Sequence, residues 1–305
     1  MNWFKGNIHT HTTKSDGDED PIKVTQWYKE HEYDFLVLTD HNHRTILDYD
    51  KNTTYSDLPL MIPGEEVTIS IQNGDITTPV HINGIGINRL VEPIDATGVV
   101  ATIQANVDSI KEAGGIASIN HPNYKWAYTI QQLVQVNGAT SIEIFNGVPD
   151  TNVYGSKSKP SCEQIWDGIL SAGKLIYGVA TDDSHHYHDF SHTMANPGKG
   201  WICVQAESLT QSEIINSIKA GTFYSSTGVF IKELDILEQS FNITIREDQS
   251  SEFRTTFTGY NGQTLYETDD IKIEYKIPVT EKYVRATIQS SNGSKAWTQP
   301  VFNNL

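Results

Sequence analysis

Short apolar runs alternate with segments of helical periodicity over the first three quarters of the chain. This alternation limits the possible folds more than any other feature of the sequence. The apolar runs predict strands at residues 3–8, 35–39, 60–68, 80–87, 115–120, 141–145, 175–180 and 201–205, and the periodic segments predict helices at 22–32, 101–113, 161–171 and 210–220. Such alternation predicts an α/β fold with a mostly parallel sheet. So many strands in about 225 residues suit a closed barrel better than a small open sheet.

Beyond residue 230 the helical periodicity stops and the pattern becomes that of short strands. Alternating segments at 241–246, 254–258, 271–276 and 283–289 are separated by polar turns such as Tyr260-Asn261-Gly262. This texture predicts a small antiparallel β module. We therefore expect two domains, an α/β barrel over residues 1–230 and a sandwich-like β module over residues 231–305.

Composition excludes several classes of function. The 305 residues carry 22 Lys and Arg against 38 Asp and Glu, a formal charge of −16, which argues against binding to duplex nucleic acid. No apolar run reaches the ~20 residues that span a membrane, so no membrane partner is expected. No signal-peptide pattern opens the sequence, which favours a cytoplasmic location unless a signal was removed before this numbering begins. We expect Cys162 and Cys203 to be buried thiols rather than a disulfide pair.

The 11 histidines of the sequence gather near the ends of the predicted strands. His9 and His11 end the first strand, and alternation along a strand points both side chains to one face. Asp16 lies in the loop after this strand, and Glu65 or Glu66 ends the third strand. Other polar residues follow later strands: His41, His121, Asp182 or Asp183, and His185. The carboxyl ends of parallel barrel strands meet on one face, so these residues are expected to converge there. His81 precedes its apolar run, and it fits only if that strand is antiparallel or begins earlier.

Imidazole and carboxylate groups without thiolates indicate a site for zinc, manganese or iron. Structural zinc sites usually contain cysteine and close with four ligands, so this set favours a catalytic centre of two or three ions. Each motif alone is weak, because a single histidine after a strand is more often a hydrogen-bonded loop residue. The prediction of a metal site depends on the occurrence of all these motifs together in one chain. We expect Asp40 to orient a ligand, His31 to be exposed, and the remaining histidines to flank the site: His43, His186, His188 and His192.

The motifs, in their order along the chain, resemble those of the polymerase and histidinol phosphatase (PHP) superfamily. The resemblance covers about residues 3–228 and includes H-x-H (His9, His11), S-D-G (Asp16), T-D-H-N (His41), G-x-E (Glu66), a single His81, N-H-P (His121) and D-x-H (Asp183, His185). It implies a distorted (β/α)7 barrel with a centre of two or three divalent ions. The G-x-E spacing selects Glu66 over Glu65, and the D-x-H spacing selects Asp183 over Asp182.

The resemblance also implies how the ligands are shared among the ions. His9, His11 and Asp183 would bind the first ion, and Glu66 would bridge it to a second. The second ion would be completed by His81 and His121, and the third held by Asp16, His41 and His185.

The end of the chain resembles one branch of this superfamily. Phe223-Tyr224-Ser225-Ser226-Thr227-Gly228, followed by a β module with Tyr283-Val284-Arg285 and Ala296-Trp297-Thr298, is similar to the carbaryl-hydrolase-like branch. Members of that branch are mostly described as metallohydrolases without known natural substrates. No polymerase region is present, so a replicative role is not expected.

The leading functional hypothesis is a metal-dependent phosphoesterase, which hydrolyses a small, anionic phosphate ester by a metal-activated hydroxide. Arg44 and Lys199 are candidates for binding the phosphate, and His43 for protonating the leaving group, as are His186 and His188. The first alternative is hydrolysis of a carboxyl ester, carbamate or amide at the same site. The second alternative is a non-catalytic, metal-loaded binding module. The sequence does not indicate an oligomeric state.

Overall fold

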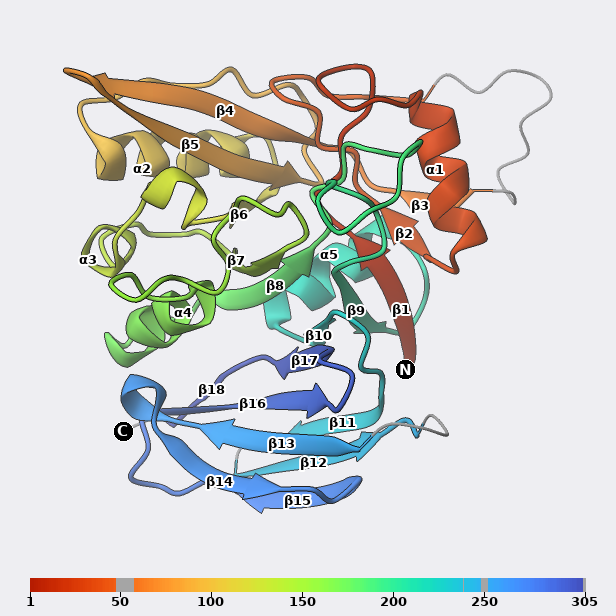
Figure 1. Cartoon of the computed structure of the whole chain (residues 1–305), viewed down its shortest axis with the longest axis vertical. Helices are drawn as coiled ribbons and strands as arrows, with labels where there is room; N and C mark the ends of the chain where they lie inside the picture. Colours follow the sequence, from red (N-terminus) through yellow and green to blue (C-terminus); the bar gives the residue numbers. More distant parts are fainter. Residues whose placement is uncertain (48–57, 238, 248–251, 304–305) are drawn as a thin grey trace.

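The computed structural model describes residues 1–47, 58–237, 239–247 and 252–303. Figure 1 shows an upper α/β part and a lower β-rich part. The strands of the upper part are β1 (Asn2–Asn7), β2 (Phe35–Leu36), β3 (Leu60–Met61), β4 (Gly64–Asn73), β5 (Ile76–Ile85), β6 (Ile116–Ile119), β7 (Ser141–Asn146), β8 (Tyr177–Thr181), β9 (Trp201–Ala206) and β10 (Phe223–Ser226). Its helices are α1 (Pro21–Glu30), α2 (Val99–Glu112), α3 (Ile130–Leu133), α4 (Cys162–Ser171) and α5 (Gln211–Ala220).

The predicted elements of this part are present, with one strand divided. The run predicted at 60–68 is split into β3 and β4 around Pro63. Proline has no backbone N–H to donate to a strand ladder, which accounts for the break. The sequence had suggested that Glu66 ends a strand. In the structure Glu66 instead lies near the start of β4.

Strand directions correct the expectation of a mostly parallel sheet. One sheet has the order β4-β5-β6-β7-β8, in which β5 is antiparallel to β4 and β6, whereas β6, β7 and β8 are parallel. A tight turn at Gly74 (φ 61°) joins β4 to β5. So short a connection permits only an antiparallel pair, because a parallel crossover needs a dozen or more residues. The fold is thus mixed α/β, and a (β/α)7 barrel is not assigned from these sheets.

Two isolated parallel bridges connect this sheet to the second one, which contains β9-β1-β2-β3. One bridge pairs Thr10, after β1, with Ser184, after β8, and the other pairs His41, after β2, with Glu66. Helix α2 packs on β5 and β6, α4 on β7, and α5 on β9. The bridges bring the segments that follow β1, β2 and β8 to the start of β4, so the polar residues of these segments share one rim.

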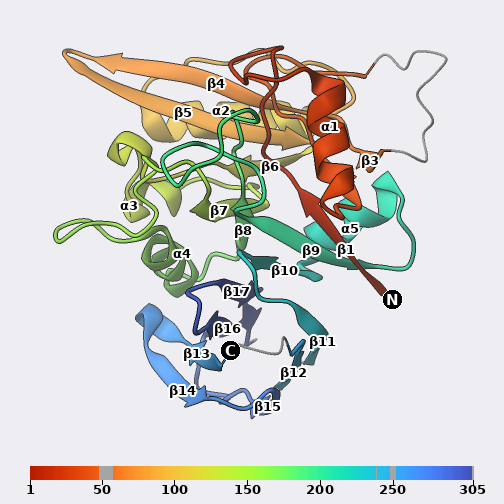
Figure 2. The same ribbon diagram turned by 45° about the vertical axis from the view of Figure 1, so that its right-hand side comes forward.

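The C-terminal strands are β11 (Ile231–Leu237), β12 (Ser240–Ile245), β13 (Phe253–Thr258), β14 (Thr264–Thr268), β15 (Lys272–Lys276), β16 (Tyr283–Ser290), β17 (Lys295–Thr298) and β18 (Val301–Phe302). They are antiparallel, as predicted, and the turned view in Figure 2 shows them as a β-rich layer below β10. Side chains of the sheet β11-β12-β15 and of β13 and β16 share one apolar core, which includes Phe241, Phe257 and Ile288. The domain boundary at residue 230 stays a prediction, and β17 pairs with β10 across it.

A buried ion pair joins this β module to helix α4. Arg285 on β16 donates from Nε and Nη2 to the two carboxylate oxygens of Asp167, at 2.7 Å each, and its Nη1 lies 3.1 Å from Glu163. The Arg285 side chain is 2% exposed and lies over the ring of Trp166. The contacts thus fix the module against the helix that covers β7.

Two further expectations concern the thiols and the membrane. Cys162 and Cys203 are both buried and free, as predicted. Among the described residues, no helix is both long enough and apolar enough to cross a membrane.

Candidate metal centre

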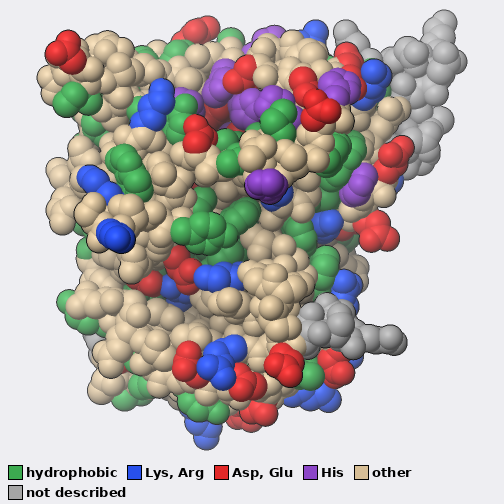
Figure 3. Space-filling model, viewed as in Figure 1, with side chains coloured by type: hydrophobic (Ala, Val, Ile, Leu, Met, Phe, Trp, Pro, Cys, Tyr) green, Lys and Arg blue, Asp and Glu red, His purple; other side chains and the backbone are tan. Residues whose placement is uncertain are grey.

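The predicted ligands gather at the rim where the two sheets meet. Figure 3 shows histidine side chains, with acidic ones among them, grouped in the upper part of one face. The orientation of His81 is explained by β5, which begins at Ile76 and pairs His81 with Thr68 on antiparallel β4. Both conditions that the sequence had set for His81 are therefore met, since its strand is antiparallel and begins earlier than its apolar run.

The carboxylate of Glu66 lies at the centre of the cluster. Its side chain is 1% exposed, and five imidazole nitrogens surround it. From Oε1 the distances are 3.0 Å to His81 Nδ1, 3.5 Å to His9 Nε2 and 3.6 Å to His121 Nε2, and from Oε2 they are 2.8 Å to His41 Nδ1 and 3.4 Å to His11 Nε2. Asn120 also donates from Nδ2 to Oε1 at 2.7 Å, which holds the carboxylate in this orientation.

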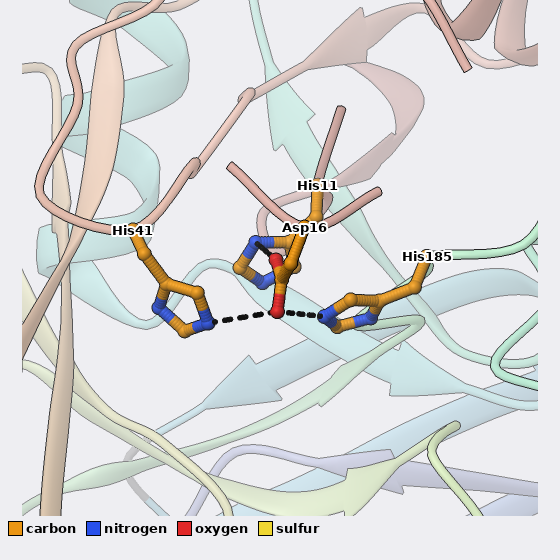
Figure 4. A group of neighbouring side chains, drawn as sticks. All are labelled: His11, Asp16, His41 and His185. Carbon is orange, nitrogen blue, oxygen red and sulfur yellow. Dashed lines mark ion pairs between the residues drawn. The ribbon is translucent and has the colours of Figure 1, made fainter. Parts of the chain in front are cut away.

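Two other carboxylates complete the cluster. Asp183 Oδ1 lies 3.1 Å from Nε2 of both His9 and His11. Asp16 lies between two rings, as Figure 4 shows, with Oδ2 3.4 Å from His41 Nε2 and 3.5 Å from His185 Nε2. The Asp16 side chain is 52% exposed, whereas Asp183 is almost fully buried. Asp16 therefore marks the solvent side of the cluster.

The cluster fits divalent ions in both spacing and chemistry. Three groups of side chains each place their ligand atoms within 4.8 Å of one another: His9, His11 and Asp183; His41, Glu66 and His81; and His11, Asp16, His41 and His185. Two ligand atoms that are ~2.1 Å from one ion lie about 3.0–3.4 Å apart at octahedral or tetrahedral angles. Nearly all of the contacts around Glu66, Asp183 and Asp16 lie close to this range.

Two buried ring nitrogens provide an independent observation. Nε2 of His9 and Nε2 of His11 lie near carboxylate oxygens, but among the described residues neither nitrogen forms a hydrogen bond of normal geometry. A buried polar atom without a partner costs about 1–3 kcal/mol, which ligation of an ion would offset. The grouping differs from the implied one in that His41 joins Glu66 and His81, while His121 Nε2 lies 3.6 Å from Glu66.

Environment distinguishes Glu66 from its neighbour Glu65. Burial raises the pKa of Glu65 to about 7, and its Oε1 accepts from the backbone N–H of Val91 at 2.6 Å. Burial would also raise the pKa of Glu66, but the charges of His81 and His9 hold it well below the usual value. Of these two glutamates, Glu66 is therefore the one that provides a stable carboxylate inside the histidine cluster.

The same contrast separates Asp183 from Asp182. Burial raises the pKa of Asp182, whose Oδ2 accepts from the Tyr28 hydroxyl and whose Oδ1 accepts from the Gly200 N–H. For Asp183 the burial effect is outweighed by His9 and His11, and its pKa falls well below the usual value. Adjacent carboxylates thus have different tasks, one holding a loop and the other facing the histidines.

Asp40 acts on the loop that carries Asp16. Its Oδ1 accepts from the Thr12 N–H and from the Ser15 hydroxyl, both at 2.8 Å. Ser15 is adjacent to Asp16, and its hydroxyl lies 3.3 Å from His11 Nδ1. Asp40 thus fixes this loop, and its carboxylate is connected to the ligands through Ser15.

Sequence reasoning missed Glu143, which lies in the middle of β7. Its Oε1 accepts from His9 Nδ1 at 2.6 Å and from the Thr181 hydroxyl at 2.7 Å. Its Oε2 accepts from the His121 N–H and from Asn146 Nδ2. A carboxylate inside the apolar run 141–145 was the available signal, because a buried charge needs several partners. Glu143 fixes the His9 ring so that Nε2 faces Glu66 and Asp183.

Replacing Glu143 with glutamine is expected to lower metal affinity by about 10- to 100-fold. One carboxylate oxygen would be replaced by an NH2 group, which cannot accept the hydrogen bonds that Glu143 now accepts. We expect the His9 ring to turn as a result. Competition with a fluorescent chelator measures the affinity. Gln164→Glu on α4, where Gln164 only closes the helix cap with Ser161, is the control and should keep wild-type affinity. An unchanged affinity in Glu143→Gln would contradict the positioning role.

The residues proposed to bind phosphate or protonate the leaving group lie outside the cluster. The ammonium of Lys199 donates to the carbonyls of Gly147, at 3.2 Å, and of Met194. Arg44 is half-buried, and its charge partly offsets the increase that burial causes in the pKa of Glu65. His43 is exposed. The roles of these three residues stay predictions.

The histidines that flank the cluster contact residues outside it. His186 Nδ1 lies 3.4 Å from Asp18 Oδ2, and His188 Nε2 lies 3.2 Å from the Asp18 carbonyl. His192 borders a neighbouring hollow together with Lys199. His31 is exposed, as expected, and its ring stacks on Trp27.

A hollow of about 140 Å³ opens above the ligands. Besides the proposed ligands, its lining includes Tyr124, Val148, Asp150 and Thr151. The Tyr124 ring contacts His121 edge-on, with centroids 5.1 Å apart. The cluster thus has an adjoining space for a small molecule.

Comparison with known proteins supports the fold assignment. No protein-family model matches the chain, and no curated protein matches its sequence. A solved two-domain protein from Bacteroides vulgatus, described as containing a predicted PHP-like metal-dependent phosphoesterase, is 16% identical with a TM-score of 0.53, and the match covers 96% of this chain and 91% of that one. At this identity the likeness shows the fold alone. Because the match covers 96% of this chain, it extends into the C-terminal β module.

Two other solved structures match at lower TM-scores. An amidohydrolase from Chromobacterium violaceum is 16% identical, with a TM-score of 0.41 and coverage of 63% of this chain and 93% of that one. A lesion-specific endonuclease from Pyrococcus furiosus is 10% identical, with a TM-score of 0.41 and coverage of 72% and 56%.

Proposed function

We propose that the protein, whose fold is similar to that of the Bacteroides vulgatus PHP-like protein, is a metal-dependent hydrolase that cleaves a phosphate ester of a small molecule. The observation that carries the proposal is the convergence of nine imidazole and carboxylate side chains, seven of which line one hollow, with two buried ring nitrogens facing two buried carboxylates. The Bacteroides vulgatus protein is described as containing a predicted metal-dependent phosphoesterase, which supports the same reaction class.

The residues divide into three sets that would hold divalent ions. His9, His11 and Asp183 form the deepest set, and Glu66 connects it to His41 and His81. Asp16 and His185 lie on the solvent side. Bound zinc, manganese or iron ions would supply Lewis acidity and would lower the pKa of a coordinated water. We also propose that these ligands lie on the rim of a distorted (β/α)7 barrel.

The protein's own groups have three tasks in this proposal. Glu143 and Asn120 fix the orientation of His9 and Glu66, so the ligands need not reorganise when ions bind. The buried position of these groups excludes bulk water from one side of the site, which strengthens electrostatic interactions there. Tyr124 and Thr151 provide hydroxyl groups at the wall of the hollow for orienting the substrate.

A second candidate is hydrolysis of a carboxyl ester, carbamate or amide by the same centre. The observation in its favour is that the hollow, among the described residues, has no Lys or Arg in its wall. A neutral carbonyl substrate needs no such cation. The proposed likeness to the carbaryl-hydrolase-like branch agrees with this candidate. A non-catalytic metal-binding role remains the third candidate.

Turnover by the metal-free protein after reloading with manganese, zinc or iron tests these candidates. We expect metal-dependent hydrolysis of p-nitrophenyl phosphate or bis-p-nitrophenyl phosphate, and loss of this activity when a chelator is added. Turnover of p-nitrophenyl acetate alone would instead favour the carboxyl-ester candidate. Absence of turnover of all three substrates by the reloaded protein would contradict the hydrolase that we propose and would favour the non-catalytic candidate.

A further inference from the structure

An interface hollow of about 210 Å³ lies where the β module meets the α/β part. Its lining comes from β7, the connection that follows β7, the start of α4 and β17, and it includes Phe145, Tyr154, Glu163, Lys295 and Trp297. Figure 3 shows hydrophobic side chains at the middle height of the molecule, with acidic and basic side chains directly beneath them. None of the proposed ion ligands is among the described residues that line this hollow, so it is separate from the metal centre.

Three of the lining residues are aromatic. The rings of Phe145 and Trp297 lie nearly parallel, 28° apart, with their centroids separated by 6.4 Å. The Tyr154 side chain is 80% exposed, but the turn that carries it is fixed, because the Cys162 N–H donates to the Val153 carbonyl at 2.9 Å. Aromatic rings that are held in place can stack against the apolar face of a ring-shaped ligand at little cost in entropy.

The charged groups of the interface hollow neutralise each other. Lys295 Nζ lies 3.4 Å from Glu163 Oε2, and Glu163 Oε1 lies 3.1 Å from Nη1 of the buried Arg285. Burial would raise the pKa of Glu163, but the charges of Arg285 and Lys295 hold it below the usual value, so the carboxylate is ionised. An ionic ligand would have to break these pairs. A hydroxyl group need not, since it can donate to the Glu163 carboxylate and accept from the Lys295 ammonium.

The two charged residues are also held in position and partly open to solvent. The Thr227 N–H donates to the Lys295 carbonyl, and the Lys295 N–H donates to the Thr227 hydroxyl, at 2.9 Å each. The Thr287 hydroxyl donates to Glu163 Oε1 at 3.0 Å. The side chains of Glu163 and Lys295 are 24% and 27% exposed. A ligand in the hollow can therefore reach both groups, and little ordering of the protein is needed.

We propose that the interface hollow binds a short, neutral oligosaccharide, with one pyranose ring beside the aromatic side chains and its hydroxyl groups on Glu163 and Lys295. A pyranose combines an apolar face with neighbouring hydroxyl groups and carries no charge, which matches the aromatic residues and the neutralised pair. The hollow is smaller than the ~300–1,000 Å³ of sites for drug-sized molecules, so it suits a single ring.

The neighbouring space explains why more than one sugar unit is proposed. A hollow of about 380 Å³ adjoins the interface hollow and shares Phe145, Val153 and Tyr154 with it. A second ring therefore has room next to Tyr154. No proposed ion ligand takes part in either contact, so saccharide binding is independent of the proposed function.

Saturation-transfer NMR titration with five neutral trisaccharides tests the proposal: maltotriose, cellotriose, xylotriose, mannotriose and chitotriose. At least one should bind with a Kd of about 1 mM or lower, and equally to the manganese-loaded and the metal-free protein. Tyr154→Ala should weaken this binding about tenfold by removing a stacking face, and Lys295→Met about tenfold by removing a charged donor. Tyr260→Ala and Lys272→Met, at exposed positions elsewhere in the β module, are the matched controls and should keep the wild-type Kd.

Failure of all five trisaccharides to bind, or an unchanged Kd in Tyr154→Ala or in Lys295→Met, would overturn the proposal. Binding that requires manganese would also overturn it, because the sugar would then lie at the metal centre. Tryptophan and adenosine serve as competing probes, and tighter binding of either one than of every trisaccharide would assign the hollow to planar aromatic ligands instead. Circular dichroism should show native secondary structure in all four variants, since each replaced side chain is at least partly exposed.

Discussion

Glu66→Gln is expected to remove bound metal and to lower metal-dependent turnover by about a thousandfold or more. The Glu66 carboxylate contacts all five of the rings that surround it, with nitrogens at 2.8–3.6 Å. Glutamine has nearly the same size, but one of its terminal atoms becomes an N–H donor that cannot bind a cation. Metal content by elemental analysis and turnover of p-nitrophenyl esters measure the two effects.

The adjacent Glu65→Gln variant is the matched control. Glu65 is equally buried, but it binds the Val91 N–H and does not contact the histidines. It should therefore retain metal and activity, since a glutamine oxygen can still accept from Val91. Circular dichroism should show native secondary structure in both variants. Wild-type metal content in Glu66→Gln, or metal loss in Glu65→Gln, would show that the ligand is assigned to the wrong glutamate.

Arg285→Met is expected to lower the free energy of unfolding by about 3–5 kcal/mol. The change leaves the carboxylate of Asp167 buried without its cation, at the contact between β16 and α4. The Tyr283 hydroxyl, which also donates to Asp167, cannot replace two charged hydrogen bonds. Thermal or denaturant unfolding, followed by circular dichroism, measures the loss.

Two comparison variants make this prediction specific. Arg254 forms a similar two-point pair with Asp269, but both side chains are more than half exposed, so Arg254→Met should leave the unfolding midpoint almost unchanged. The double variant Arg285→Met with Asp167→Leu removes both buried charges and should recover much of the stability. Equal effects of Arg285→Met and Arg254→Met would mean that burial of the first pair does not matter for stability.

Most strands and helices follow from the sequence, because their signals are local. Short apolar runs predicted β1, β7 and β9 to within a residue or two. The errors have tertiary causes. A mostly parallel sheet was expected, yet the short turn at Gly74 makes an antiparallel hairpin of β4 and β5. Helix α3 was not predicted, since its single turn is too short for periodicity to show.

The candidate ligands could be identified because their positions follow from strand periodicity and spacing. His9 and His11 lie two residues apart on one strand end, so a single face receives both side chains whatever the rest of the fold does. The choice between Glu65 and Glu66 needed more than this rule. Adjacent residues point to opposite faces of β4, and only the packing of the other strands decides which face meets the histidines.

The sequence by itself therefore determined the chemistry of the site: imidazole and carboxylate groups, without thiolates, in segments that adjoin strands. The tertiary structure alone decided which residues hold these groups in place. Glu143 contacts His9 across 134 positions of the chain, and Asn83 on β5 donates to the carbonyl of Ile8 across 75. Local periodicity fixes the faces of one strand but not its neighbours, because strand neighbours are set by hydrogen bonds and packing between segments distant in the chain.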